Sequence, residues 1–203
     1  MTANMKGDQP SRQQRKSATR QALLRAAQDV LKAHGLTGTT TRAIAKQAGV
    51  ASGTLFVHFA DVNALVEALL DEHIAAALAQ AYRTLPRNGD VVKRLLHVAG
   101  TLYASYLREP ELAKAYLAAS LFTPVAGELS VRLAAFQTWV IGEINAAVAA
   151  RAIPDIDRQL AFAAFFSLYF GMLVAGLNGM LTRKQQLANL DGALRRLLQL
   201  EAA

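Results

Sequence analysis

The stretch from Thr40 to Phe59, TTRAIAKQAGVASGTLFVHF, constrains the fold of this chain of 203 residues more than any other segment. Two short helical patterns flank a turn at residues 48–51, where Gly49 is suited to the left-handed conformation that ends a helix. The small side chain of Ala45 lets the following helix approach closely. Four apolar residues supply a small core that holds the two helices at an angle: Ile44, Val50, Leu55 and Phe59. This spacing predicts a helix-turn-helix.

Helical patterns continue on both sides of this segment. No sustained alternation of apolar and polar residues predicts a strand, so the fold is expected to be all-α with about nine helices. Ser17 or Thr19 is expected to cap the first helix and Gly35 to end it, while Asp61 is a suitable cap for the fourth. The expected helices span about 17–34, 39 or 40 to 48, 52–59, 61–85, 90–108, 110–122, 125–151, 155–181 and 185–200.

The positive charge of the chain is concentrated at its N-terminal end. Residues 1–62 contain nine Lys and Arg against three Asp, a net charge of +6, whereas residues 63–203 contain 13 basic and 12 acidic residues. A basic module beside a nearly neutral one is typical of nucleic-acid binding by one module, although basic termini also serve as solubilising tails. We expect a disordered basic leader at 1–16, a helix-turn-helix domain at 17–62 and a second helical domain at 63–203.

The predicted second and third helices present residues suited to a nucleic-acid surface. Thr40 and Thr41 begin the second helix, where free N–H groups and the helix dipole favour a phosphate. Arg42 is long enough to reach a base edge or a phosphate. The outward side chains of the third helix are short, polar or aromatic, and none is acidic: Ser52, Gly53, Thr54, Phe56, Val57 and His58. Such a surface fits a groove lined by phosphates, so the segment is expected to bind DNA.

The pattern T-T-x-x-I-A-x-x-A-G-V-x-x-G-T-L-[YF]-x-H-F at Thr40 to Phe59 resembles that of the TetR family of transcriptional regulators. The resemblance covers about residues 18–70, and beyond them only the layout of long helices is similar. It implies a DNA-binding regulator whose C-terminal domain binds a small effector and forms a homodimer. It also implies individual roles: phosphate contacts for Thr40, Thr54 and His58, and contacts with bases or sugar edges for Arg42, Ser52, Gly53 and Phe56.

Two positions depart from the family pattern. The family usually has Tyr at the position of Phe56 and Lys at the position of Val62, so two phosphate contacts are expected to be missing. We expect Arg42, Lys46 or the basic leader to replace them, which makes DNA binding depend on the leader more than in typical relatives. Simpler roles also remain, because Phe56 can complete the small core and His58 can cap the end of its helix.

The second half of the chain contains a long uncharged run from Gln159 to Thr182. Its length would allow a transmembrane helix at 160–181, and it contains the small residues used in membrane helix packing. A helix that is apolar all round is equally suited to the interior of a soluble protein. The segment at 185–200 is amphipathic, and in TetR-like proteins the last two helices pair with those of a twofold mate. A homodimer through these two helices, without membrane insertion, is therefore favoured over a membrane anchor.

Aromatic residues are concentrated in the nearly neutral half, where they can line an apolar cavity. Core packing explains any single one of them equally well, but the family resemblance implies a ligand pocket between about 90 and 175. The expected lining residues are Tyr103, Tyr116, Trp139 and Phe166. Because charged residues are sparse in this region, the effector is expected to be largely apolar or aromatic.

The sequence contains no catalytic constellation. It has no cysteine, no phosphate loop and no G-x-S-x-G segment, and its four histidines lack the spacing of metal ligands. We therefore expect no enzyme activity, no cofactor and no metal, and a cytoplasmic protein. The favoured function is a ligand-responsive repressor that binds operator DNA. The alternatives are a membrane-anchored helical protein and a helical adaptor that binds no DNA.

Overall fold

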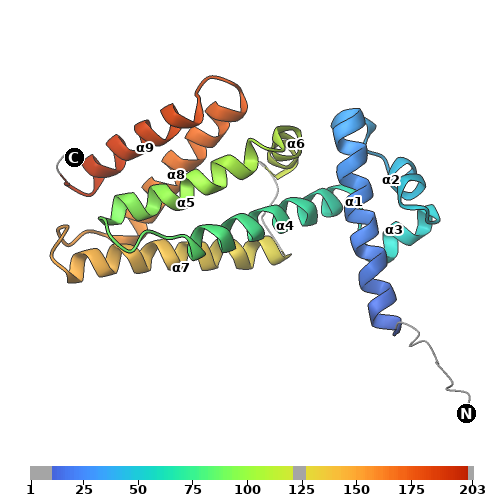
Figure 1. Ribbon diagram of the computed structural model, residues 1–203, viewed down its shortest axis with the longest axis horizontal. Coiled ribbons are helices and arrows are strands. Elements are labelled where there is room, and N and C mark those ends of the chain that lie inside the picture. Colours follow the sequence, from blue (N-terminus) through green and yellow to red (C-terminus); the bar gives the residue numbers. More distant parts are fainter. Residues whose placement is uncertain (1–10, 121–126, 201–203) are drawn as a thin grey trace, which may run out of the picture. The chain divides into compact units, whose positions relative to one another are not determined.

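The computed structural model describes residues 11–120 and 127–200. Every regular element within these ranges is an α-helix, which confirms the expected all-α fold (Figure 1). The helices are α1 (Arg12–Gly38), α2 (Thr41–Ala48), α3 (Ser52–His58), α4 (Val62–Arg83), α5 (Val91–Tyr106), α6 (Pro110–Ser120), α7 (Gly127–Ala149), α8 (Arg158–Leu177) and α9 (Arg183–Leu197). The expected boundaries of α2 to α9 differ from these by a few residues at most.

The first helix begins earlier than the sequence analysis predicted. Ser11 caps it: the Gln14 N–H donates to Ser11 Oγ at 3.2 Å, and the Ser11 N–H donates to Gln14 Oε1 at 2.6 Å. This reciprocal pair of hydrogen bonds is a capping box. Its residues are polar, and the same composition is found in disordered segments, so the sequence alone did not reveal the start of the helix. The expectation of disorder at 1–16 is therefore wrong for residues 11–16, while residues 1–10 lie outside the described part of the chain. Gly35, the predicted end of this helix, interrupts it with a positive φ of 65°.

Residue contacts divide the chain into two units, whose boundary falls inside α4 between Leu69 and Leu70. This is a few residues beyond the boundary expected at residue 62. The first unit contains α1, α2, α3 and the beginning of α4. Its buried apolar residues are Leu23, Leu24, Ala26, Ala27, Val30, Leu31, Ile44, Ala45, Leu55, Phe59, Leu65, Val66 and Leu69. They occur at helical spacing on α1 and α4, so each of these helices buries one face.

The second unit consists of the rest of α4 and helices α5 to α9. Helix α5 packs against α7, α8 and α9, and α8 also contacts α6, α7 and α9 (Figure 1). Two buried tyrosines join α5 to α8: the Tyr103 hydroxyl donates to the Tyr169 carbonyl oxygen at 2.9 Å, and their rings stack with centroids 5.1 Å apart. An ion pair joins α5 to α7, with Arg94 Nε 2.5 Å from Glu143 Oε2. These polar groups therefore satisfy one another inside a mainly apolar bundle.

Close packing of α8 against α9 depends on a glycine. Gln186 is fully buried on α9, and its Nε2 donates to the Met172 carbonyl oxygen on α8 at 2.6 Å. A Cβ atom on Gly176 would lie 2.1 Å from this Nε2 atom. The absence of a side chain at Gly176 thus leaves the space that the Gln186 amide occupies.

Helix α8 has the composition that raised the alternative of a membrane span. By length and composition it is the one continuous helix within 11–120 and 127–200 that qualifies; α3 and α4, bent by 58° at their junction, would qualify only if counted together as one span. Of the 18 residues in the most apolar part of α8, 33% are buried within the chain. The residues exposed on this helix include Leu160, Ala163, Ser167 and Gly171, which form one largely uncharged face.

Candidate nucleic-acid interface and ligand cavity

The turn between α2 and α3 has the geometry that its sequence predicts. Thr40 caps α2, and its Oγ1 accepts the Ala43 N–H at 3.2 Å. Gly49 ends α2 in the left-handed conformation, with φ 68° and ψ 30°. The Val50 N–H then donates to the Ala45 carbonyl oxygen at 3.0 Å, which completes the hydrogen-bond pattern of a Schellman motif. These local bonds direct the chain from α2 into α3.

Helix α3 buries one residue and exposes most of the others. Leu55 is fully buried and anchors the helix on the core of the first unit. Phe56 is 58% exposed and Val57 68% exposed, so Phe56 does not complete the small core. Ser52 and Gly53 are also exposed, while Thr54 and His58 are half-buried. A surface of this kind, with small polar and apolar side chains and no acidic one, can contact base edges and thymine methyl groups in a major groove.

Gly53 leaves the N-terminal part of α3 open. A Cβ atom placed on it would meet nothing within 4 Å, and its φ is not in the left-handed region. The fold of the chain therefore does not require glycine at this position. Close approach of a partner to the helix backbone would require it.

Cationic residues lie on α2 and on α1. Arg42 and Lys46 are exposed on α2, and Thr41 is half-buried at its first position. The pKa of His58 at the end of α3 is lowered by its partial burial and by the positive charges of Lys16 and Arg20 on α1. The two α1 cations are therefore close enough to influence the end of α3.

Arg20 on α1 also contacts the residue that follows α3. Its guanidinium lies over the ring of Phe59, 5.1 Å from the centroid, which is within the range of a cation–π contact. Val62, where the sequence departs from its family pattern, is half-buried at the start of α4. Cations on the first helix thus lie beside the segment that lacks the usual lysine.

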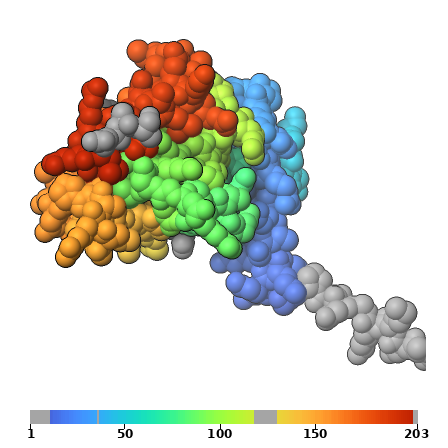
Figure 2. Space-filling model, turned by 60° about the vertical axis from the view of Figure 1, so that its left-hand side comes forward, coloured from blue at the N-terminus to red at the C-terminus, as the bar shows by residue number. Residues whose placement is uncertain are grey.

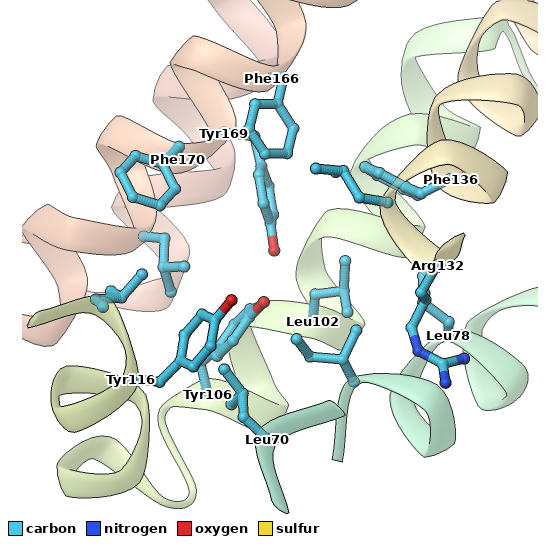
Figure 3. Close-up of a pocket in the computed structure, with 14 residues that line it drawn as sticks. Leu70, Leu78, Leu102, Tyr106, Tyr116, Arg132, Phe136, Phe166, Tyr169 and Phe170 are labelled. Carbon is cyan, nitrogen blue, oxygen red and sulfur yellow. The ribbon is translucent and has the colours of Figure 1, made fainter. Parts of the chain in front are cut away.

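The second unit contains an apolar cavity of about 290 Å³ (Figure 3). Five helices contribute to it: α4, α5, α6, α7 and α8. Of the four expected lining residues, the structure brings Tyr116 and Phe166 to this cavity. Its lining residues are Leu70, Ile74, Leu78, Leu102, Tyr106, Tyr116, Leu117, Arg132, Leu133, Phe136, Phe166, Tyr169, Phe170 and Leu173.

The other two expected residues lie outside the cavity wall. Tyr103 is fully buried and its hydroxyl is bonded to the Tyr169 carbonyl oxygen. Trp139 packs between Tyr82, at a centroid distance of 5.2 Å, and Phe136, at 6.1 Å. Since Phe136 lines the cavity, Trp139 is one ring removed from any occupant.

Three polar lining residues were not selected from the sequence: Tyr106, Tyr169 and Arg132. The tyrosines follow Tyr103 and Phe166 by three residues, so helical spacing places each pair on neighbouring parts of one helix without showing which member lines a cavity. No local signal identified Arg132, whose guanidinium bonds Asp71 on α4 with Nε–Oδ1 at 2.6 Å and NH2–Oδ2 at 2.9 Å. Asp71 is 8% exposed, and the pair is bidentate. The cavity wall is therefore close to electrically neutral.

The described residues contain no group of three or more His, Cys, Asp or Glu side chains that could hold a metal ion. The two features that stand out chemically are the exposed helix-turn-helix surface and the apolar cavity. Together with the helical layout, they define a helix-turn-helix protein with a second, cavity-containing helical unit.

Comparison with known proteins identifies the family. Residues 23–69 match the family described as "Bacterial regulatory proteins, tetR family". Residues 23–69 therefore form a DNA-binding domain of the TetR family, and the α2–α3 segment is its helix-turn-helix.

Individual relatives match over part of their length. The chain is 33% identical over 96 residues to the uncharacterized HTH-type transcriptional regulator YvkB of Bacillus subtilis, an alignment that covers 47% of this chain and 49% of that protein. The chain spans about half the length of the curated relatives it matches.

Solved structures with the same fold extend over nearly the whole chain. One is a TetR family transcription regulator from Marinobacter aquaeolei VT8, with 21% identity, a TM-score of 0.61 and coverage of 90% of this chain and 96% of that one. Another is RolR in complex with resorcinol, with 15% identity, a TM-score of 0.71 and coverage of 94% and 92%. At these identities the likeness concerns the fold alone.

Proposed function

We propose that this TetR-family chain is a cytoplasmic transcriptional repressor that binds operator DNA and is released by a small, largely apolar or aromatic effector. The observation that carries the proposal is the solvent-exposed, acid-free surface of α3, which a capped turn holds next to the cations of α2. This surface suits a groove lined by phosphates.

DNA contacts divide into two kinds on this surface. Thr41 at the start of α2 offers its N–H group to a phosphate, and Thr40 and Thr41 both offer hydroxyls, whereas the Thr40 N–H already donates to the Gly38 carbonyl oxygen. Thr54 and His58 are proposed as further phosphate contacts. The residues proposed to face bases or sugar edges are Arg42, Ser52, Gly53 and Phe56. Lys46, exposed on α2, would contribute a further phosphate contact.

The cations of α1 offer a replacement for the contacts that Phe56 and Val62 lack. Lys16 affects the pKa of His58, so its charge lies near the same end of α3. We expect Lys16→Gln to lower the salt dependence of operator binding by about one unit of slope, as for the loss of one phosphate contact. An unchanged slope would remove Lys16 from the interface.

A homodimer through α8 and α9 is part of the proposal. Small residues recur every four positions on the exposed face of α8, at Ala163, Ser167 and Gly171, and on α9 at Ala188 and Gly192. Figure 2 shows α9, coloured red, at the surface of the second unit. Small side chains let helices approach closely, and a dimer would cover the apolar face of α8. The α3 helices of the two subunits, held roughly 34–36 Å apart, would enter successive major grooves of an operator with a pseudo-palindromic sequence.

Effector binding is assigned to the cavity of the second unit. Its lining is mainly aliphatic and aromatic, as in most small-molecule sites. The fold relative RolR was solved with the small aromatic compound resorcinol. If effector and operator act through one equilibrium, each weakens binding of the other by the same factor. Equal effector affinity with and without operator would contradict this coupling.

The test of DNA binding is fluorescence anisotropy with the DNA upstream of the protein's own gene, over a range of salt concentrations. Arg42→Ala is expected to cost about 1–3 kcal/mol of specific binding. Arg87→Ala is the matched control, because it removes one exposed positive charge from the second unit. Equal losses in both variants, or no salt-dependent binding at all, would favour the adaptor without DNA binding.

Solubility tests the membrane alternative. The proposed dimer stays in solution without detergent and sediments as a dimer, because a second copy covers α8. A protein that is recovered only with detergent would instead support a span within 160–181.

A further inference from the structure

The cavity of the second unit has one polar end. Figure 3 shows the hydroxyls of Tyr106, Tyr116 and Tyr169 directed toward one another inside it. These tyrosines come from three different helices, α5, α6 and α8. Apart from Arg132, the remaining lining residues are Leu, Ile and Phe. The cavity thus combines an apolar body with a single cluster of hydroxyl groups.

Among the described residues, the Tyr169 hydroxyl is the member of this cluster that is buried without a hydrogen bond of normal geometry. Its residue is 4% exposed, and its Oη atom is buried without a hydrogen-bond partner among the residues that the structure describes. Leaving a buried hydroxyl unpaired costs about 1–3 kcal/mol. The side chain cannot easily turn away, because its ring stacks on Tyr103 at an interplanar angle of 7° and also contacts Phe165 and Phe166. A ligand that reaches Tyr169 Oη would supply the missing bond.

The polar end of the cavity is neutral. Burial raises the pKa of Tyr106 to about 12. Burial also raises the pKa of Tyr169 well above its ordinary value, and the nearby Tyr106 hydroxyl raises it further. Both hydroxyls are therefore protonated near pH 7. A neutral Tyr169 hydroxyl can therefore donate a hydrogen bond to a ligand.

The one cation in the wall is already compensated. Arg132 makes its bidentate ion pair with Asp71, and in Figure 3 its guanidinium points away from the tyrosine hydroxyls. A carboxylate ligand would therefore meet hydroxyls and apolar side chains without an uncompensated positive charge. Burying a charge without such a partner is much more costly than burying a neutral polar group.

We propose that the cavity takes a small neutral ligand with an aromatic or aliphatic body and one oxygen atom that accepts a hydrogen bond from Tyr169 Oη. This ligand class rests on the proposed effector function of the same cavity and narrows it. The volume of about 290 Å³ lies near the lower limit of the roughly 300–1,000 Å³ of typical ligand sites, which suits one or two rings. Tyr169 acts as the residue that selects the neutral oxygen.

Three probes with similar bodies test this class in calorimetric titrations of the full chain: acetophenone, ethylbenzene and benzoate. Acetophenone carries a neutral acceptor, ethylbenzene carries none, and benzoate carries a charge. One additional hydrogen bond predicts that acetophenone binds about fivefold to tenfold more tightly than ethylbenzene. Benzoate is expected to bind most weakly.

Two tyrosine variants locate the source of the preference. Tyr169→Phe should abolish the preference for acetophenone over ethylbenzene without lowering the thermal stability of the ligand-free protein, since the hydroxyl has no partner to lose. Tyr103→Phe is the matched control: it removes a neighbouring buried hydroxyl that is bonded to backbone and lies outside the cavity wall. This control should retain the preference.

Four outcomes would overturn the inference: equal binding of acetophenone and ethylbenzene, tightest binding of benzoate, retention of the preference in Tyr169→Phe, or no saturable binding of acetophenone. Each probe is also tested for release of operator DNA. Release by benzoate alone would overturn the ligand class but leave the proposed repressor function in place. The predicted binding preference without any release would support the ligand class and contradict the repressor mechanism.

Discussion

The two units of this protein differ in how their functional residues are distributed along the chain. Apart from the proposed contact of Lys16 on α1, the proposed DNA surface lies within the single segment from Thr40 to His58, and its groups are mostly exposed. The cavity is assembled from five helices between Leu70 and Leu173. A surface made by one turn and two short helices depends mainly on local bonds, whereas a cavity depends on how distant helices pack. The first is accessible to pattern analysis, and the second requires the structure.

Each unit also holds a group in an environment opposite to its polarity. The first unit exposes the apolar side chain of Phe56, and the second buries the unpaired hydroxyl of Tyr169. Either arrangement is unfavourable for the isolated chain, and each is relieved by a partner of the matching kind. In both units, therefore, a group at the proposed binding site lowers the stability of the unbound chain, whereas most surrounding residues are in environments that match their polarity. Substitutions at and away from these sites test this difference.

The largest expected effect is on the stability of the second unit. Gly176→Ala would place Cβ against the Gln186 amide and break its bond to the Met172 carbonyl oxygen. We expect the free energy of unfolding to fall by about 1–3 kcal/mol, as for overpacked cores. Urea denaturation monitored by circular dichroism measures it. Gly142→Ala on α7 is the control, because a Cβ there meets nothing within 4 Å.

In the first unit, a glycine should matter for binding and not for folding. Gly53→Ala adds a methyl group that meets no atom of the chain, and it gains helix propensity of up to about 1 kcal/mol. If Gly53 faces bases or sugars, operator affinity falls about tenfold, equivalent to about 1.4 kcal/mol. Anisotropy titrations and thermal melts of the same variant separate the two effects. Undiminished operator affinity would place Gly53 outside the interface.

Removal of a satisfied buried hydroxyl should cost more than removal of an unpaired one. Tyr103→Phe loses the bond to the Tyr169 carbonyl oxygen, so the free energy of unfolding should fall by about 1 kcal/mol. Tyr169→Phe should show no such loss. If both variants are destabilised equally, Tyr169 Oη is bonded in the folded protein and the contrast between the units is weaker.

The smallest expected effect is the pH dependence of DNA binding. Burial, Lys16 and Arg20 lower the pKa of His58 below 6.5 in the free protein, whereas a bound phosphate would raise it. Binding would then take up a proton, so operator affinity should rise as the pH falls from 7.5 to 6. Because an ion pair between His58 and a phosphate would be partly exposed, operator affinity should rise by about twofold to fivefold. His58→Gln should remove this dependence, and an identical pH profile in that variant would contradict the phosphate contact.

Much of the fold followed from local rules. The caps at Thr40 and Asp61, the left-handed Gly49 and the helical spacing predicted the boundaries of α2 to α4 within a few residues. The start of α1 was missed because Ser11 and Gln14 form a capping box within a segment whose polar composition also suits disorder. In the cavity, Tyr116 and Phe166 were identified, but Tyr103 and Tyr106 differ by less than one turn on the same helix. Composition cannot distinguish which of two such residues faces a cavity.

The sequence by itself determined the helix-turn-helix, its family and the all-α class, because caps, turns and helical periodicity act over a few residues. Only the tertiary structure decided that Tyr169 Oη has no hydrogen-bond partner within residues 11–120 and 127–200, that Asp71 compensates Arg132, and that Tyr103 belongs to the core. These properties depend on contacts between residues more than 60 positions apart. Such contacts arise from the packing of whole helices, and no short segment encodes them.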